Sequence, residues 1–500
     1  MSYRNASTKI FLVALLFFPL AYRIGAQEQP QQPPPQEPQF PPATEPQQPP
    51  QEPPDENNPY GSMPKPAGKS LPYFDFGLGN GDIHPDYTPL TGMLNAGLGF
   101  PDVKHSYWVP GISYSSTVQS HLFGSPTTTG WYENNYVTGN ISLLEAWTHS
   151  QFALNYSGGA TFSTNNELGT SGFQQLAFAQ SFLLNRWIIQ IVDEFSQLPQ
   201  SGFGFGVGTA LGIPGIGGSL GPTIPGIGSN YSPSQSIFGG FGPRYSNTAV
   251  MQATYALTRR SSITASAAYG ILNFVDPGNI DTRSLFASLG YNYAVTHNDS
   301  IGAYYQYGSY QFPGNPQAYH TQTVSAAYSR KITGRLALSL YGGPQFTSLR
   351  IPVGSTSTLV NAYASAFLTY ALQNGSISGH YLHGISGGSG VLEGSIEDQL
   401  GVSAGRKLTR VWHASFNVGY AHNRTVVSSA GIANPSYDDW FAGVGIGRPI
   451  GRSLSFNLAY TATFQTSNPG CSGTGCASGT TSGQVVTVNF AWHPRPFVLQ

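Results

Sequence analysis

The chain has 500 residues, of which only 9% are charged and 13% are aromatic, and its formal net charge is −1. An average soluble protein carries charge on roughly 25% of its residues, so a soluble fold with this composition would tend to self-associate. The near-zero net charge gives no basis for binding nucleic acid, and the composition favours a membrane protein or an exported β-rich protein.

The first 26 residues have the organisation of a secretory signal peptide. Arg4 and Lys9 precede the apolar run IFLVALLFFPLAY, and small residues follow as far as Ala26. This run is too short to cross a bilayer as a helix, which disfavours a membrane anchor, and no cysteine follows it for lipid attachment. We predict a signal peptide at residues 1–26, with cleavage near Ala26.

Two segments separate the signal peptide from the main body of the chain. Residues 27–70 are dominated by Pro and Gln and form no apolar face, which predicts a disordered periplasmic linker. This linker serves either as a spacer or as a contact with the cell wall. Residues 71–104 are mixed in character, and the alternatives are a plug inserted into a lumen or a simple crossing to the first strand.

Residues 105–496 contain no apolar run long enough for a transmembrane helix, but they repeatedly alternate apolar and small polar residues. SLSFNLAYTATF, VWHASFNVGYAHN, SSITASAAYGI and VVTVNFAW all follow this period of two. Such alternation predicts strands with two different faces. The apolar face repeatedly carries Tyr, as in the aromatic girdle of a membrane barrel, and the other face is Ser, Thr, Asn, Gln, Gly and Ala with almost no charge.

The lengths of the connections predict a transmembrane antiparallel up-and-down β-barrel. Very short links alternate with longer ones rich in Gly, Pro, Ser, Thr and Asn, which gives about 18 strands with both termini on the short-turn side. The first strand, near residues 109–119, is the weakest signal, so 16 strands is the alternative. Half of the 22 Lys and Arg cluster at the short turns, where an anionic leaflet would attract them. They are Arg186, Arg259, Arg260, Arg330, Lys331, Arg335, Arg406, Lys407, Arg410, Arg448 and Arg452.

In this pattern residues 105–496 resemble the outer-membrane β-barrels of the porin type found in Gram-negative bacteria. The resemblance implies a channel in the outer membrane, inserted by the barrel-insertion machinery, and it leaves homo-oligomerisation open. The stretch VVTVNFAW is similar to the terminal strand of that family. It departs from the family because HPRPFVLQ follows it, whereas the family usually ends at an aromatic residue.

The most unusual connection is residues 196–243, which contain no charged residue and repeat the motif IPGIG. By our strand count this is the third long loop, which in general porins folds into the lumen and narrows the pore. Here it lacks the acidic residues usual in those porins, which implies a neutral or apolar constriction; an external loop is the alternative. The candidate constriction residues are Ile213, Ile216, Leu220, Ile224 and Ile227.

Other candidate groups carry less chemistry. Tyr304, Tyr363 and Phe367 are expected on the inner face, where their rings would stack on sugars or fill space. Cys471 and Cys476 are expected to form a disulfide in an external loop. We find no motif for a catalytic set, a metal or a cofactor, and we expect the acidic pairs at 397–398 and 438–439 to be solvated loop charges.

The predicted function is therefore a channel for small neutral or weakly apolar solutes, and not an enzyme. Two alternatives remain: a structural or adhesive barrel, and a gated transporter of hydrophobic compounds.

Overall fold

The structure is a computed structural model that describes the strands and part of the connections between them. The described residues are 85–87, 89–90, 106–120, 130–164, 169–200, 236–237, 241–275, 278–315, 317–350, 356–426, 434–468 and 479–499. The predicted signal peptide, the Pro-rich linker and both cysteines lie outside these residues. No helix in the described part of the chain is long and apolar enough to cross a membrane.

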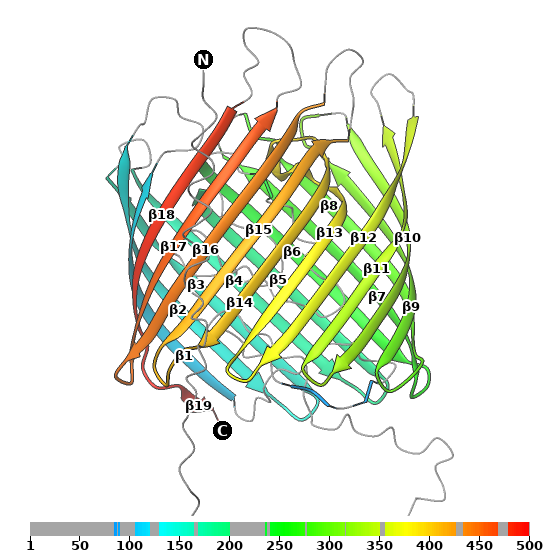
Figure 1. Cartoon of the computed structure of the whole chain (residues 1–500), viewed down its shortest axis with the longest axis horizontal. Coiled ribbons are helices and arrows are strands. Elements are labelled where there is room, and N and C mark those ends of the chain that lie inside the picture. Colours follow the sequence, from blue (N-terminus) through cyan, green and yellow to red (C-terminus); the bar gives the residue numbers. More distant parts are fainter. Residues whose placement is uncertain are drawn as a thin grey trace, which may run out of the picture. The chain divides into compact units, whose positions relative to one another are not determined.

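Eighteen antiparallel strands of the described chain form one sheet that closes on itself, as predicted from the alternation (Figure 1). Each strand pairs with its neighbours in sequence, and β18 pairs with β1. The first strand, the weakest signal in the sequence, is present. The strands are β1 (Ser106–Ser120), β2 (Trp131–Ala146), β3 (Ser150–Ser163), β4 (Thr170–Leu183), β5 (Trp187–Gln200), β6 (Phe241–Ala256), β7 (Ser261–Phe274), β8 (Thr282–Ala294), β9 (Asp299–Gln311), β10 (Ala318–Thr333), β11 (Leu336–Arg350), β12 (Thr356–Leu372), β13 (Gly375–Ser386), β14 (Ser395–Lys407), β15 (His413–Thr425), β16 (Ser436–Ile450), β17 (Leu454–Asn468) and β18 (Gly479–Trp492).

The two faces of the sheet differ as the alternation predicts. On β7, Ile263 and Tyr269 are exposed on the outer face, whereas Ser266 and Ala268 between them are buried on the inner face. An apolar exterior suits contact with lipid, and a closed sheet leaves no free edge to expose backbone groups there. The core therefore consists of the inner wall together with the segments that fold against it.

The connections divide by length between the two ends of the barrel, with the short ones at the lower end in Figure 1. The short connections, of which 147–149 is the first and 451–453 the last, have two to five residues each. The connection 201–240 at the other end has 40. The charge-free stretch 196–243 is therefore not all loop, because β5 and β6 extend into its two ends.

The seam between the last and first strands has an additional component that was not predicted. After β18 the short strand β19 (Phe497–Leu499) pairs with the start of β1, opposite residues 106–108. The ring of Phe497 stacks on Trp108 with centroids 4.8 Å apart. Residues 497–499 thus also belong to the sheet, beyond the predicted end of the barrel at residue 496.

Candidate functional site

The candidate site is the lumen, whose wall is built from small polar side chains. Partly exposed polar residues on the inner face include Ser113, Thr264, Gln306 and Asn457, which come from strands around the ring. Hydroxyl and amide groups can hydrogen-bond water or a passing polar solute, so this wall suits a hydrated pore.

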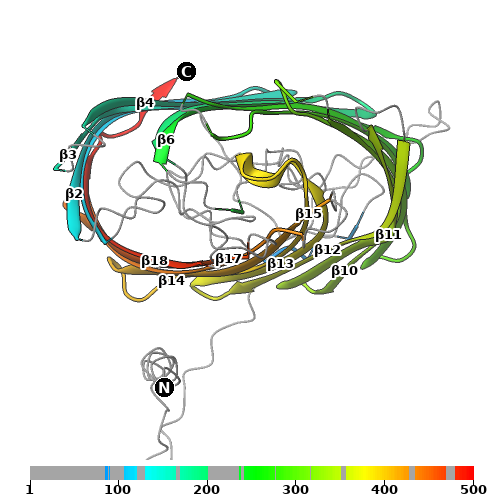
Figure 2. The same cartoon turned by 90° about the horizontal axis from the view of Figure 1, so that it is seen from above.

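A segment between β13 and β14, residues 387–394, folds into the barrel at its long-connection end (Figure 2). It contains a short 3-10 turn at Gly388–Gly390, where Ser389 has a φ of 58° and both flanking glycines have a φ of 78°. A left-handed conformation at consecutive positions is accessible mainly to glycine, so the GGSG sequence permits this sharp inward turn.

The inward segment crosses to strands on the opposite side of the ring. The backbone N–H of Ile280 donates to the carbonyl of Gly390 over 2.8 Å. The hydroxyl of Tyr310 on β9 donates to the carbonyl of Ile385 over 2.8 Å, and the amide of Asn315 donates to the carboxylate of Glu393. The segment is therefore held from the β7–β10 side as well as from its own strands.

The described end of the third long connection reaches the same place. Ser236 is buried, and its hydroxyl donates to Asn423 Oδ1 on β15 over 3.0 Å. The backbone N–H of Ile237 donates to Ser389 Oγ over 3.2 Å. The connections 201–240 and 387–394 thus contact each other, through Ile237 and Ser389, inside the barrel at its long-connection end. The predicted constriction residues Ile213, Ile216, Leu220, Ile224 and Ile227 lie outside the described residues, so their role stays a prediction.

The predicted lumen aromatics lie on the inner wall, on strands β9 and β12. Tyr304 on β9 lies beside Tyr305, which is exposed on the outer face, and its hydroxyl donates to Asn292. Tyr363 and Phe367 on β12 alternate with exposed Val360 and Leu368, so both face inward. A role for these three rings in contact with a solute stays a prediction.

The acidic pairs at 397–398 and 438–439 are not loop charges, contrary to the prediction. They lie within β14 and β16, where successive residues face opposite sides. Glu397 and Asp439 are buried on the inner wall, and Asp398 and Asp438 lie on the outer face. The amide of Gln399 donates to the carboxylate of Glu397. Because Glu397 and Asp439 face inward, the inner wall carries acidic groups.

The pre-barrel segment contacts the short-turn end of the lumen at its described residues. Asp86 pairs with Lys331 of β10 over 2.7 Å, and its backbone N–H donates to the carbonyl of Gly334. The N–H of Leu90 donates to the carbonyl of His297 over 2.8 Å. Lys331 therefore faces inward and is buried, whereas the sequence placed it among cations beside the lipid.

The inward segment 387–394 is a feature that the sequence interpretation missed, and Glu397 is one that it named but placed in a loop. The signal that could have found the segment is its run of glycines, GISGGSG, in a connection of only eight residues. Among the described residues no group of three or more His, Cys, Asp or Glu is placed to hold a metal ion.

No family model matches the sequence, and no curated protein matches it. The fold is similar to that of several solved outer-membrane proteins. OccK2 (OpdF) of Pseudomonas aeruginosa has 11% identity and a TM-score of 0.41, over 78% of this chain and 99% of that one. A BenF-like porin from Pseudomonas fluorescens Pf-5 has 10% identity and a TM-score of 0.40, over 79% and 99%. OpdQ of P. aeruginosa has 9% identity and a TM-score of 0.39, over 78% and 98%. The likeness concerns the barrel architecture and carries no information on the solute.

Proposed function

We propose that the protein is a channel of the bacterial outer membrane that conducts small, mainly uncharged solutes, and that it is not an enzyme. The observation that carries the proposal is a closed barrel with an apolar outer face and an inner wall of Ser, Thr, Asn and Gln. The outer face requires a bilayer, and the inner wall is suited to water. Export by a cleaved signal peptide at residues 1–26 and assembly by the barrel-insertion machinery belong to this proposal.

The constriction of this channel is formed by two inward connections, 201–240 and 387–394. The contacts of Ser236 with Asn423 and of Ile237 with Ser389 support this part of the proposal, because they join the two connections inside the barrel. In the third connection, Ile213, Ile216, Leu220, Ile224 and Ile227 supply an apolar surface that favours weakly apolar solutes over ions.

The pre-barrel residues 71–104 lie at the periplasmic opening in this proposal. The docking of Asp86 and Leu90 on the turns around β8–β11 supports this position, since β1 begins on the opposite side of the ring.

Single-channel conductance of the purified full chain in a planar bilayer tests the proposal. We expect steady steps, and we expect larger steps after residues 203–232 are replaced by a short Gly-Ser linker. The matched control shortens the connection 427–433 at the same end and should leave the conductance unchanged. A silent bilayer, from protein shown to have inserted, would contradict the channel and favour a structural barrel or a gated transporter.

A further inference from the structure

Four aromatic rings form one surface on the inner wall of β9, β11 and β12. They are Tyr304, Tyr341, Tyr363 and Phe367, which we name the aromatic strip. In the register of β11 and β12, Tyr341 pairs with Ser365, which lies between Tyr363 and Phe367 on the same face. The rings of Tyr304 and Tyr341 meet edge to face with centroids 5.9 Å apart.

The rings of the strip lie along the wall. Tyr304 is in register with Gly290 of β8, and a Cβ on Gly290 would fall 2.2 Å from two ring atoms of Tyr304. A Cβ on Gly384 of β13 would lie 3.2 Å from the ring of Tyr363. Because glycine leaves this space free, the rings of Tyr304 and Tyr363 cover the neighbouring backbone, which keeps their bulk out of the lumen.

Partial exposure separates the strip from several rings that are buried inside the barrel. Phe173, Phe286 and Phe441 are fully buried on the inner side of the sheet, whereas the four rings of the strip are all partly exposed. The strip therefore has ring surface that a solute can reach, and the buried rings serve packing.

Polar atoms without partners adjoin the strip. The amide nitrogen of Gln345 donates to Thr323 Oγ1 over 3.2 Å, but its buried Oε1 has no hydrogen-bond partner among the described residues. This oxygen lies 3.9 Å from the position of a Cβ on Gly384, next to the ring of Tyr363. His380, in register with Phe367, is also buried, and its Nε2 makes no hydrogen bond with the described part of the chain.

The wall that carries the strip has almost no charge. Among the described residues of β9–β13, Lys331 is the only charged side chain on the inner face, and it pairs with Asp86 at the short-turn end. The charged group on the adjoining strand is Glu397 of β14, in register with Gly384. An anionic solute would therefore lose hydration along this wall without meeting a counter-charge, and an uncharged solute would not.

We infer that the aromatic strip is a binding surface for uncharged sugars. A sugar ring has an apolar face of C–H groups that packs on an aromatic ring and a rim of hydroxyls that hydrogen-bonds to amide, imidazole and phenol groups. The strip offers aromatic rings for the C–H face, and Gln345, His380 and the tyrosine hydroxyls beside them for the sugar hydroxyls. This inference rests on the proposed channel and names its solute class.

Block of single-channel current by added maltose tests the inference. With the full chain in a planar bilayer, we expect millimolar maltose to reduce the open-channel current. Tyr341→Ala, Tyr363→Ala and Phe367→Ala should each raise the half-blocking concentration about fivefold or more. The controls Tyr305→Ala and Leu368→Ala change the lipid-facing neighbours on the same strands and should leave the block unchanged.

A second variant keeps all four rings but displaces one of them. Gly290→Ala should move the ring of Tyr304 off the wall and weaken the block by maltose, whereas Gly342→Ala should have no effect, because its Cβ would meet nothing closer than 3.7 Å. Native electrophoretic mobility of each variant reports that the barrel has folded.

The outcomes separate the two proposals. Conductance that maltose does not block would overturn the strip as a sugar site and leave the channel standing. A stronger block by galacturonate or by benzyl alcohol than by maltose would overturn the assignment to uncharged sugars. Absence of conductance in inserted protein would overturn the channel itself.

Discussion

Both rims of the barrel have hydrogen bonds from a tyrosine to an aspartate on the outer face, but the other partners of the aspartate differ between the rims. At the long-connection rim, Tyr381 on β13 donates to Asp398 on β14 over 3.0 Å, and His383 lies 2.6 Å from the same carboxylate oxygen. The arrangement repeats two strands further on, where Tyr420 donates to Asp438 over 2.7 Å and His422 lies 2.8 Å from it.

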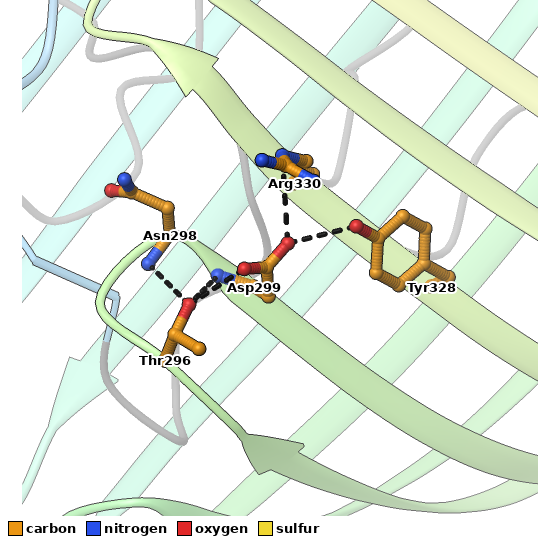
Figure 3. Close-up of polar contacts among 5 residues, drawn as sticks. All are labelled: Thr296, Asn298, Asp299, Tyr328 and Arg330. Carbon is orange, nitrogen blue, oxygen red and sulfur yellow. Dashed lines mark hydrogen bonds and ion pairs between the residues drawn. The ribbon is translucent and has the colours of Figure 1, made fainter.

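At the short-turn rim, Tyr328 on β10 donates to Asp299 on β9 over 2.8 Å, and Arg330 takes the position of the histidine at 3.6 Å (Figure 3). The turn before β9 adds a further contact, because Thr296 Oγ1 donates to the other carboxylate oxygen over 2.7 Å. The same hydroxyl accepts from the backbone N–H of Asn298 over 3.1 Å.

The difference shows what a short turn contributes. At the short-turn rim the aspartate is fixed by the turn itself and faces a guanidinium that is always charged. At the long-connection rim, the hydrogen bonds of the described residues to Asp398 and Asp438 come from strand side chains, a tyrosine and a histidine in each case. The girdle tyrosines occupy equivalent places at both rims, as expected for residues with an apolar ring and a polar end at a membrane interface.

Removing the inward cation at the short-turn rim should have the largest effect. Lys331→Met should lower the free energy of unfolding by about 3 kcal/mol, because it removes the ion pair with Asp86 from a site where the Lys331 side chain is only 4% exposed. Urea unfolding of the folded protein in detergent measures this loss. The control Arg330→Met, at a neighbouring side chain that is 53% exposed, should lose much less. Equal losses would contradict the distinction between the inward and outward cations.

Removing the aspartate fixed by the turn should have the next largest effect. Asp299→Asn should cost about 1 kcal/mol, because it weakens the contacts of Asp299 with Tyr328, Arg330 and Thr296 together. A double-mutant cycle with Tyr328→Phe measures the share of the tyrosine, and we expect the two changes to be non-additive. Additive losses would show that the hydrogen bond between Tyr328 and Asp299 does not contribute.

The aspartates of the long-connection rim should matter less individually. Asp398→Asn and Asp438→Asn should each cost about 0.7 kcal/mol, since each carboxylate is partly exposed and its hydrogen bonds with the described residues come from strand side chains. Unfolding at low and high salt measures the electrostatic part, which salt should screen. A loss larger than that of Asp299→Asn would reverse the ranking of the two rims.

The smallest effect is expected from a cation on an aromatic ring at the short-turn rim. Arg448 on β16 lies over the ring of Trp412 with 5.1 Å between its Cζ atom and the ring centroid. Arg448→Gln should cost about 0.5 kcal/mol, and Arg448→Lys should retain part of that contribution. Thermal unfolding of the three proteins side by side measures the order, and a lysine variant less stable than the glutamine variant would contradict it.

The strands and their faces could be predicted because each is encoded locally. In SSITASAAYGI the outward Ile263 and Tyr269 and the inward Ser266 and Ala268 follow from the period of two alone. The strand number and the division into short and long connections follow from the same pattern.

The contents of the lumen could not be predicted because they depend on pairs that are far apart in the sequence. Asn315 and Glu393 are 78 residues apart, and Ser236 and Asn423 are 187 apart. The same limit explains the misplaced acidic pairs. A one-residue uncertainty at a strand end decides whether Glu397 is treated as a loop charge or as a buried group on the inner wall.

The short strand β19 has a consequence for the order in which the barrel assembles. The seam joins residues at opposite ends of the sequence, since Gln484 donates to Ser120 across 364 positions and Asn489 to Ser115 across 374. Such a closure costs the most chain entropy and should therefore form late in folding. Residues 497–499 then pair with β1 at its first residues, beyond the reach of β18. The C-terminal residues thus pair with the first strand at 106–108 and at 112–120. A C-terminal truncation before Phe497 should leave a ring that closes but opens more readily at the short-turn end of its seam.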